Sequence, residues 1–337
     1  MKKLTIFMVV IDILVAICFY VVYCVDDFKN IIITTAMTTK SHQWIAYTFY
    51  SPEDVNEVLA MDAYIPLTDD VNLNDIVIDT SEKDSYDNAY DEAILTRDPG
   101  NEDYKLINVK VGRYDGFLVA IYDPSKVRLI HSKVFNANNR GKETILSMCK
   151  RYGGLVCING GGFVDYGSGS DIPIGYIIKD SKVIWSTSSG PGNLIGFTND
   201  NKLLLVSATG EEAIKMGMRD AVEFGPYLII NGKTLQFSNS QNVGGYSRAA
   251  RSVIAQRRDG VVLFLVTNGT HANGPNTGEI IDVLVKYGAY NAAYMDGGTS
   301  TTLVANNRLI NTPLNIYGKP ANGGIGRYVV NGWGLIP

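Results

Sequence analysis

One kind of strand ending recurs along this sequence: an apolar run stops at Asn or Asp, and glycine follows at once. It occurs at Asn159 in LVCINGGGF, at Asn231 in LIING, at Asn268 in LFLVTNG and at Asp296 in AAYMDGG. Asn-Gly and Asp-Gly also make tight hairpin turns, and IINGKTLQF around Asn231 fits that alternative. The other three lead into loops that are too long or too polar for two-residue turns, and sites are commonly built from such loops.

The stretch DGGTST supplies the groups that chemistry on an anion needs. A carboxylate at the end of a core strand is costly to bury, so we expect Asp296 to be used. Gly297 and Gly298 have no Cβ, which lets a ligand reach the backbone and lets consecutive N–H groups point at one anion. Thr299 and Ser300 then add hydroxyl donors.

Two arginines complete this set of candidates. Arg251 lies in RAARSV and Arg327 lies in GIGRYVV. A guanidinium suits a phosphate because it presents a planar fork of donors. Each of these signals is weak by itself, but together with Asp296 they predict a site for a substrate that carries a phosphate.

Short strands joined by hairpins must hold these residues. Runs such as GFLVAIYD and GLVCIN are rich in β-branched residues, and turns are expected at Asp180–Ser181, Asp200–Asn201 and Asp259–Gly260. GKETILSMCKRYG has helical spacing and stops at Gly153, and the amphipathic TGEIIDVLVKYG leads into the Asp296 stretch. Many hairpins and few helices predict an α+β domain, a mixed, mostly antiparallel sheet with packed helices.

The N-terminus predicts a transmembrane anchor over residues 1–25. Lys2 and Lys3 precede the apolar run Leu4–Val25, which is long enough to span a bilayer, and the basic flank is expected in the cytoplasm. A cleaved signal peptide would have a shorter apolar core and a small-x-small site close behind it. We therefore expect an uncleaved, single-pass protein of the cell membrane whose C-terminal domain is extracellular.

Three further segments follow the anchor. Residues 26–61 are expected to form a helical stalk, with a helix start at Ser51. Residues 62–103 carry 13 acidic and two basic side chains without a lasting period, which predicts a solvated linker and not a core element. Residues 104–337 are expected to form the catalytic domain.

Composition narrows the range of partners. The 337 residues carry a formal net charge of −4, so nothing favours nucleic acid as a partner. Four cysteines are too few for a disulfide framework. Cys149 and Cys157 lie in an expected buried helix and an expected buried strand, and we interpret them as a pair of core thiols.

The order of the motifs resembles the phosphodiester glycosidase family. CINGGGF, FGPYLIING, RAARSVIAQRRDG, the block around AAYMDGGTSTTLV, and the closing LINTP and GRYVVNG follow the family's order over about residues 104–337. The resemblance implies hydrolysis of a sugar-1-phosphodiester. It extends to membrane-attached bacterial members that are associated with exopolysaccharide, so a cell-wall or exopolysaccharide glycan is the expected substrate.

Several residues match the family's motifs position by position. The Asn-Gly-Gly turn and the acidic residue beyond it are matched by Asn159, Gly160, Gly161 and Asp165. The Arg-Ser strand, the Asp-Gly-Gly-x-Ser core and the late arginine are matched by Arg251, Asp296, Gly297, Gly298, Ser300 and Arg327. The chain departs from the family at Gly162, where an aromatic is usual, and at Asn268-Gly269-Thr270, where many members have Asp-Gly-Arg.

Glycosidic hydrolysis usually needs an acid and a base or nucleophile. Asp296 is our first candidate for one role, and Asp165 or Glu279 is the other, although Glu279 also stands where a helix would begin. Arg251 and Arg327 would hold the phosphate. The sequence is compatible with cleavage of the C–O bond and with cleavage of the P–O bond.

Two alternatives follow from the same residues. Asp296 and Asp165 would also suit calcium or magnesium, although the sequence shows no complete ligand set. The rival to an enzyme is a non-catalytic polysaccharide-binding or assembly module on the same fold. The missing carboxylate at Asn268 and the missing guanidinium at Thr270 favour the rival, and the intact Asp296 stretch opposes it.

Overall fold

The chain folds into two compact units. The computed structural model describes residues 2–37, 43–133, 135–136, 139–140, 143–164, 172–238, 245, 247–315 and 317–337. The first unit consists of Met1–Ile65 and Gln236–Arg248, and the second consists of Pro66–Leu235 and Ala249–Pro337.

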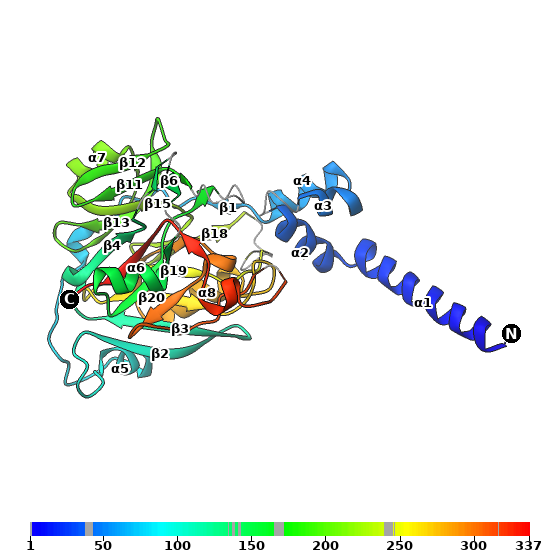
Figure 1. Ribbon diagram of the computed structural model, residues 1–337, viewed down its shortest axis with the longest axis horizontal. Coiled ribbons are helices and arrows are strands. Elements are labelled where there is room, and N and C mark those ends of the chain that lie inside the picture. The colour runs from blue at the N-terminus through cyan, green and yellow to red at the C-terminus, as the bar shows by residue number, and fades with distance from the viewer. Residues whose placement is uncertain are drawn as a thin grey trace. The chain divides into compact units, whose positions relative to one another are not determined.

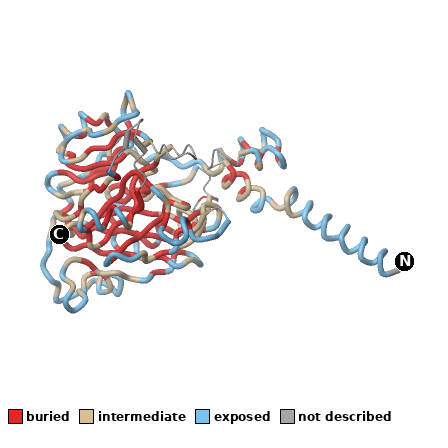
Figure 2. The backbone as a smooth tube through the Cα atoms, in the orientation of Figure 1, coloured by how far each residue is buried: buried red, intermediate tan, exposed pale blue. Residues whose placement is uncertain are grey.

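Helices make up most of the first unit (Figure 1). They are α1 (Lys2–Cys24), α2 (Asp26–Met37), α3 (Gln43–Phe49) and α4 (Pro52–Met61). The span Lys3–Cys24 has a mean hydropathy of 2.7 and none of it is buried (Figure 2), so α1 is long and apolar enough to cross a membrane. The short strand β1 (Tyr64–Ile65) pairs with β18 (Gln236–Phe237).

A small apolar core holds α2, α3 and α4 together. Its buried side chains are Ile33, Ala36, Ala46, Tyr50, Val55 and Val58. The helix start predicted at Ser51 is confirmed, because Ser51 Oγ accepts from Asp54 N and the Asp54 carboxylate accepts from Ser51 N. This reciprocal pair of bonds satisfies backbone donors that a helix start leaves without partners.

A seven-stranded antiparallel sheet lies at the centre of the second unit. Its strands run in the order β17-β16-β21-β19-β20-β3-β2. Their bounds are β2 (Tyr104–Val111), β3 (Tyr114–Ile121), β16 (Tyr227–Ile230), β17 (Lys233–Thr234), β19 (Ser252–Arg257), β20 (Val262–Thr267) and β21 (Ala289–Met295). In the central pair, Ser252 lies opposite Met295 and Arg257 lies opposite Ala289.

Two five-stranded sheets complete the core. One has the order β23-β22-β8-β25-β4 and the other has the order β12-β11-β15-β13-β14. The strands of the first are β4 (Val127–His131), β8 (Val156–Asn159), β22 (Leu303–Ala305), β23 (Arg308–Leu309) and β25 (Asn331–Leu335). Those of the second are β11 (Tyr176–Lys179), β12 (Lys182–Ser186), β13 (Gly192–Thr198), β14 (Leu203–Ala208) and β15 (Met218–Glu223).

Helices pack on these sheets, and the α+β class is confirmed. The helices are α5 (Ala89–Leu95), α6 (Ile145–Tyr152), α7 (Gly210–Lys215) and α8 (Thr277–Lys286). Shorter elements are η1 (Leu73–Asp75), η2 (Pro124–Lys126), β5 (Phe135–Asn136), β6 (Asn139–Arg140), β7 (Glu143–Thr144), β9 (Phe163–Val164), β10 (Ile172–Pro173), η3 (Gly298–Ser300), η4 (Ala321–Gly324) and β24 (Tyr328–Val329). The predicted turns are present, with positive φ at Asp180, Ser181, Asn201, Asn231 and Gly260.

The prediction that residues 62–103 are not a core element is wrong for the part in the second unit. Ile76 and Ile94 are fully buried, and Ile94 joins the apolar cluster that also holds α8 and the inner face of the seven-stranded sheet. The backbone is also bound, since Val77 N donates to Arg258 O at 2.8 Å and Asp79 N donates to Asp259 O at 2.9 Å. A few apolar side chains and specific partners hold the segment, and net charge did not predict either.

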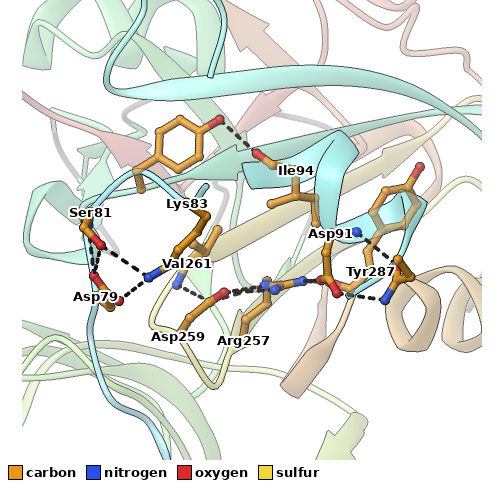
Figure 3. Close-up of polar contacts among 11 residues, drawn as sticks. Asp79, Ser81, Lys83, Asp91, Ile94, Arg257, Asp259, Val261 and Tyr287 are labelled. Carbon is orange, nitrogen blue, oxygen red and sulfur yellow. Dashed lines mark hydrogen bonds and ion pairs between the residues drawn. The ribbon is translucent and has the colours of Figure 1, made fainter. Parts of the chain in front are cut away.

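One buried arginine, Arg257, forms an ion pair with this acidic segment (Figure 3). Arg257 Nη1 lies 2.8 Å from Asp91 Oδ1, and Arg257 Nη2 lies 2.9 Å from Asp259 Oδ2. Nη1 also donates to Tyr287 O at 2.9 Å. Burial by itself lowers the pKa of Arg257, but the hydrogen bonds and charges of Asp259 and Asp91 raise it overall.

The interpretation of Cys149 and Cys157 as thiols is also wrong. They form a disulfide between α6 and β8, with their Cα atoms 5.9 Å apart. The chain reverses just after α6, where Gly153 adopts φ 70°, and it then returns beside the helix as β8. Burial of both cysteines was foreseen, but this reversal is what brings the two sulfurs together.

Candidate active site

Asn159, at the end of β8, joins the strands that surround the candidate site. Its Nδ2 donates to Asp296 O at 2.6 Å, and its Oδ1 accepts from Ser252 Oγ at 2.7 Å and from Thr302 N at 3.0 Å. Asp296 N in turn donates to Gly160 O at 2.9 Å. The buried amide of Asn159 therefore fixes where the backbone of Asp296 lies, which makes Asn159 a positioning residue.

The amides of the Asn-Gly-Gly turn are used inside the protein. Gly160 N donates to Asn331 O at 3.1 Å and Gly161 N donates to Asn331 Oδ1 at 2.7 Å. A Cβ on Gly160 would collide with Asn331 Oδ1. Gly160 thus lets β25 approach the end of β8, Gly161 lies against Val222 and Glu223 of β15, and the N–H groups of both glycines point at Asn331.

The Asp296 carboxylate sits half-buried directly after β21. Its Oδ1 accepts from Gly297 N at 3.0 Å, and the side chain of Ser300 also hydrogen-bonds to it. Burial raises the pKa of Asp296 above its ordinary 3.8, while the bond from Ser300 and the charges of Arg327 and Arg251 act against that rise. The net direction is upward, so this carboxyl holds its proton to higher pH than an exposed aspartate does.

The charges of both predicted arginines act on this carboxyl. Arg327 Nη1 donates to Ser300 Oγ at 3.0 Å, and its guanidinium lies 4.8 Å from the centre of the Phe163 ring. The guanidinium of Arg251 lies 5.4 Å from the centre of the Tyr294 ring. Stacking on an aromatic ring orients a guanidinium while its edge keeps its donors.

The bare backbone after Asp296 is required by neighbouring protein atoms. A Cβ on Gly297 would lie 2.7 Å from Arg251 Nη1, and a Cβ on Gly298 would lie 3.0 Å from the Cβ of His271. Gly298 also has φ +58°, a conformation that L side chains rarely adopt. The glycines thus bring Arg251 and His271 against the strand ending, which the sequence alone did not indicate.

The loop after β20 forms the next part of the site. Asn268 N donates to Asp115 O at 2.8 Å, and Asn268 Oδ1 is buried with no hydrogen-bond partner in the described part of the chain. His271 was missed by the sequence reasoning. A rare histidine inside a glycine-rich loop that follows an apolar strand was the available signal.

The two candidates for a second carboxylate differ in their outcome. Glu279 belongs to the capping box of α8, where its Oε2 accepts from Asn276 N at 2.9 Å and its own N–H donates to Asn276 Oδ1 at 2.9 Å. A Cβ on Gly112, in the turn between β2 and β3, would collide with the same carboxylate. Asp165 lies outside the described residues.

Thr299, which the sequence also suggested as a hydroxyl donor, lies in η3, between Gly298 and Ser300.

The described ranges contain no group of three or more His, Cys, Asp or Glu side chains that could hold a metal ion. Within these ranges Asp296 is surrounded by arginines, amides and hydroxyls, which are partners for anions.

Comparison with known families settles the family. The model of the phosphodiester glycosidase family matches residues 152–336, more than half of the chain. The chain belongs to the phosphodiester glycosidase family. The matched range includes Asn159, Arg251, Asp296 and Arg327, which the structure brings around one strand ending.

Two relatives are similar in sequence. The chain is 27% identical over 189 residues to the SPbeta prophage-derived uncharacterized protein YomE of Bacillus subtilis (strain 168), covering 53% of this chain and 28% of that protein. It is 26% identical over 168 residues to human N-acetylglucosamine-1-phosphodiester alpha-N-acetylglucosaminidase, covering 45% of this chain and 32% of that protein. The chain thus spans about a third of the length of these relatives.

One solved structure shares the fold. The zebrafish N-acetylglucosamine-1-phosphodiester alpha-N-acetylglucosaminidase catalytic domain, auto-inhibited by its pro-peptide, superposes with a TM-score of 0.57 at 18% identity. The superposition covers 70% of this chain and 82% of that one. At this identity the likeness shows the fold alone.

Proposed function

We propose that this chain is a membrane-anchored extracellular hydrolase that cleaves a sugar-1-phosphodiester in a cell-wall or exopolysaccharide glycan. One observation carries the proposal: the charges of two arginines from distant parts of the chain act on a half-buried aspartate, and one of them, Arg327, shares the Ser300 hydroxyl with it. Two guanidiniums outnumber the carboxyl even when it is ionised, and they are uncompensated when it is protonated, so the site favours an anion such as a phosphodiester, which carries one negative charge.

The proposed roles follow from this arrangement. Arg251 and Arg327 bind the phosphate oxygens, and the Ser300 hydroxyl orients Asp296 and Arg327 together. Asp296 with its raised pKa acts as a general acid that donates a proton to the leaving oxygen. Water attacks the carbon or the phosphorus of the bond that is cleaved and gives it a new oxygen. The products are a sugar and a phosphomonoester, or a sugar phosphate and an alcohol.

We propose Asp165 as the second carboxylate. The capping role of Glu279 accounts for that residue without catalysis. The name of the human relative supports N-acetylglucosamine-1-phosphodiesters as the first substrates to test. Calcium or magnesium enters the proposal only as a condition to vary, because a ligand set would have to include Asp165.

Two features support an extracellular position for the catalytic part. The apolar α1 follows Lys2 and Lys3, a flank that favours a cytoplasmic N-terminus. The disulfide between Cys149 and Cys157 is typical of an oxidising compartment and is rare in cytosol.

A panel of sugar-1-phosphodiesters tests the proposed activity. The full chain is incubated in H₂¹⁸O with methyl and glycerol diesters of N-acetylglucosamine-1-phosphate, glucose-1-phosphate and galactose-1-phosphate, with EDTA or with added calcium or magnesium. Phosphorus NMR then separates the products, and ¹⁸O on phosphorus identifies P–O cleavage. Binding of these diesters without turnover under any metal condition would support the non-catalytic module, which the Asn268 and Thr270 departures favour.

A further inference from the structure

The helix α3 carries aromatic side chains that its own unit does not cover. Trp44 is 64% exposed, Tyr47 is 50% exposed, and Phe49 is also exposed. Ala46 and Tyr50 on the same stretch are buried in the core of α2, α3 and α4. At 100° per residue, Trp44 lies about 160° around the helix axis from the buried Ala46 and Tyr47 lies about 100° from it, so Trp44 faces away from the core and Tyr47 lies at the edge of the exposed face. This aromatic face therefore needs a partner outside the unit.

The last turn of α1 sets the position of α3 within the first unit. Tyr50 OH donates to Val22 O at 2.9 Å, and the Tyr50 ring lies 6.2 Å from the Tyr23 ring in an edge-to-face arrangement. Val22 and Tyr23 belong to the apolar span that ends at Cys24. The C-terminal end of α3 is thus held at the depth of the last turn of that span.

The depth of this contact identifies the environment of α3. The headgroup layer is roughly 5–7 Å thick on each side of the hydrocarbon core. Val22 lies about 3 Å before the end of the span, and a helix of α3's length extends about 10 Å. A helix that is held at this depth lies in or next to the headgroup layer, where Trp and Tyr are enriched because their rings are amphipathic.

We infer that the aromatic face of α3, formed by Trp44 and Tyr47, inserts into the headgroup layer of the membrane that α1 spans. Phe19, Tyr20 and Tyr23 in the last two turns of α1 extend the same aromatic belt. Asp26, Asp27, Glu53 and Asp54 in the first turns of α2 and α4 give this part of the unit an acidic character. The face therefore fits a lipid surface through its rings and does not depend on anionic lipid.

This inference rests on the proposed anchoring, and one preparation tests both. The full chain is reconstituted in phosphatidylcholine nanodiscs, and co-elution with the discs tests the anchor. The emission of Trp44 is the difference between the wild type and Trp44→Phe, because Trp185 and Trp333 remain in both. Nanodiscs made with lipid brominated near the headgroup end of its chains are compared with unbrominated discs, and iodide is the aqueous quencher.

The expected result is that shallow brominated lipid quenches the Trp44 emission by about half, while iodide quenches it weakly. The remaining emission includes Trp333, which is fully buried and provides a reference out of reach of both quenchers. Replacing half of the phosphatidylcholine by phosphatidylglycerol should leave the quenching by brominated lipid unchanged.

Three outcomes would overturn the inference in different ways. A chain that does not co-elute with the discs has no anchor. A co-eluting chain whose Trp44 responds only to iodide has its aromatic face in water. A co-eluting chain whose Trp44 responds to neither quencher has that face covered by protein, such as a second copy.

Discussion

Arginine and aspartate side chains lie near both ends of the paired strands β19 and β21. Carboxylates outnumber guanidiniums at one end, and guanidiniums outnumber carboxylates at the other. At one end, Arg257 is held by the carboxylates of Asp91 and Asp259. At the other end, the charges of both Arg251 and Arg327 act on the single carboxyl of Asp296. The two ends are roughly 20 Å apart, from six residues at about 3.3 Å each.

The difference distinguishes a structural charge cluster from a candidate site. Around Arg257 the negative charges outnumber the positive charge, and the guanidinium also binds the carbonyl of Tyr287, so its donors are used within the protein. Around Asp296 the positive charges outnumber the negative one, which leaves attraction for an anion. Both ends contain arginine and aspartate, so the residue types do not distinguish them. The ratio of carboxylates to guanidiniums does.

The largest expected effect is on catalysis at the Asp296 end. Asp296→Asn keeps the shape and some hydrogen bonds but cannot donate a carboxylic proton, so kcat on the best substrate of the panel should fall by about 10²–10⁴-fold. Steady-state kinetics with a folded variant, checked by circular dichroism, measures this. Asp259→Asn is the matched control at the opposite end, and its folded fraction should keep full kcat. Equal losses in both variants would remove the distinction between the ends.

The next effect is on stability at the Arg257 end. Arg257→Ala leaves Asp91 and Asp259 partly buried without their cation, so the free energy of unfolding should fall by about 3 kcal/mol. Asp91→Asn should cost less because Asp259 still binds the guanidinium. Urea denaturation of the second unit measures both changes, with activity per folded molecule as the control. Wild-type stability in Arg257→Ala would show that the acidic segment is held by its apolar residues alone.

The contacts at the Arg257 end also predict the effect of removing the residues before Tyr104. A chain that starts at Tyr104 loses the buried Ile76 and Ile94 and the Asp91 carboxylate together. The charge imbalance of residues 62–103 predicted a solvated linker, but composition does not show which few side chains are buried. We now expect this truncation to destabilise the second unit more than Arg257→Ala does, as urea denaturation of both proteins would measure.

The parts of the candidate site that lie close together in the chain could be proposed from the sequence. Asp296, Gly297, Gly298 and Ser300 lie within five consecutive positions, so their types and spacing could be interpreted directly. The strands and hairpins were predictable for the same reason, because period and turn residues are local. The α+β class follows from those local patterns and is confirmed.

The remaining parts depend on strand order, which no local pattern contains. Asn331 binds the amides of Gly160 and Gly161 only because β25 pairs with β8. His271 contacts Gly298 because the loop after β20 folds back over the strand ending. The residues that position the candidate site come from these distant segments. The glycines were predicted to make room for a ligand, but in the structure protein atoms lie against them.

A smaller effect is expected from changing the shape of one arginine. Arg327→Lys keeps the charge but loses the planar fork that binds Ser300 and stacks on Phe163, so kcat/KM should fall by roughly tenfold, within the range for a charged hydrogen bond. Arg327→Ala should lower kcat/KM further. Arg308→Lys, on an exposed position of β23, is the control that should leave kcat/KM unchanged. An Arg327→Lys variant with wild-type kcat/KM would show that this residue supplies charge only.

The smallest effect is a pH dependence of stability that only the Asp296 end should show. The folded-state pKa of Asp296 is raised above the ordinary 3.8, mainly by burial, so the folded state holds this proton more tightly than the unfolded state. The stabilisation from that proton is fully present below about pH 3.8. It is lost as the pH rises through the folded-state pKa, because the folded state must then carry a partly buried charge.

Asp296→Asn has no proton to lose, so it avoids this loss. Its Tm relative to the wild type should be constant below pH 3.8 and should increase as the pH rises towards the raised pKa of Asp296, reaching a plateau above that pKa. Calorimetry of both proteins across this range measures the difference. Asp259→Asn should show no such gain at neutral pH, since it removes a partner of Arg257. A Tm of Asp296→Asn that falls below the wild type at neutral pH would mean that Arg251 and Arg327 outweigh burial and that the Asp296 end is held together by its charges as the Arg257 end is.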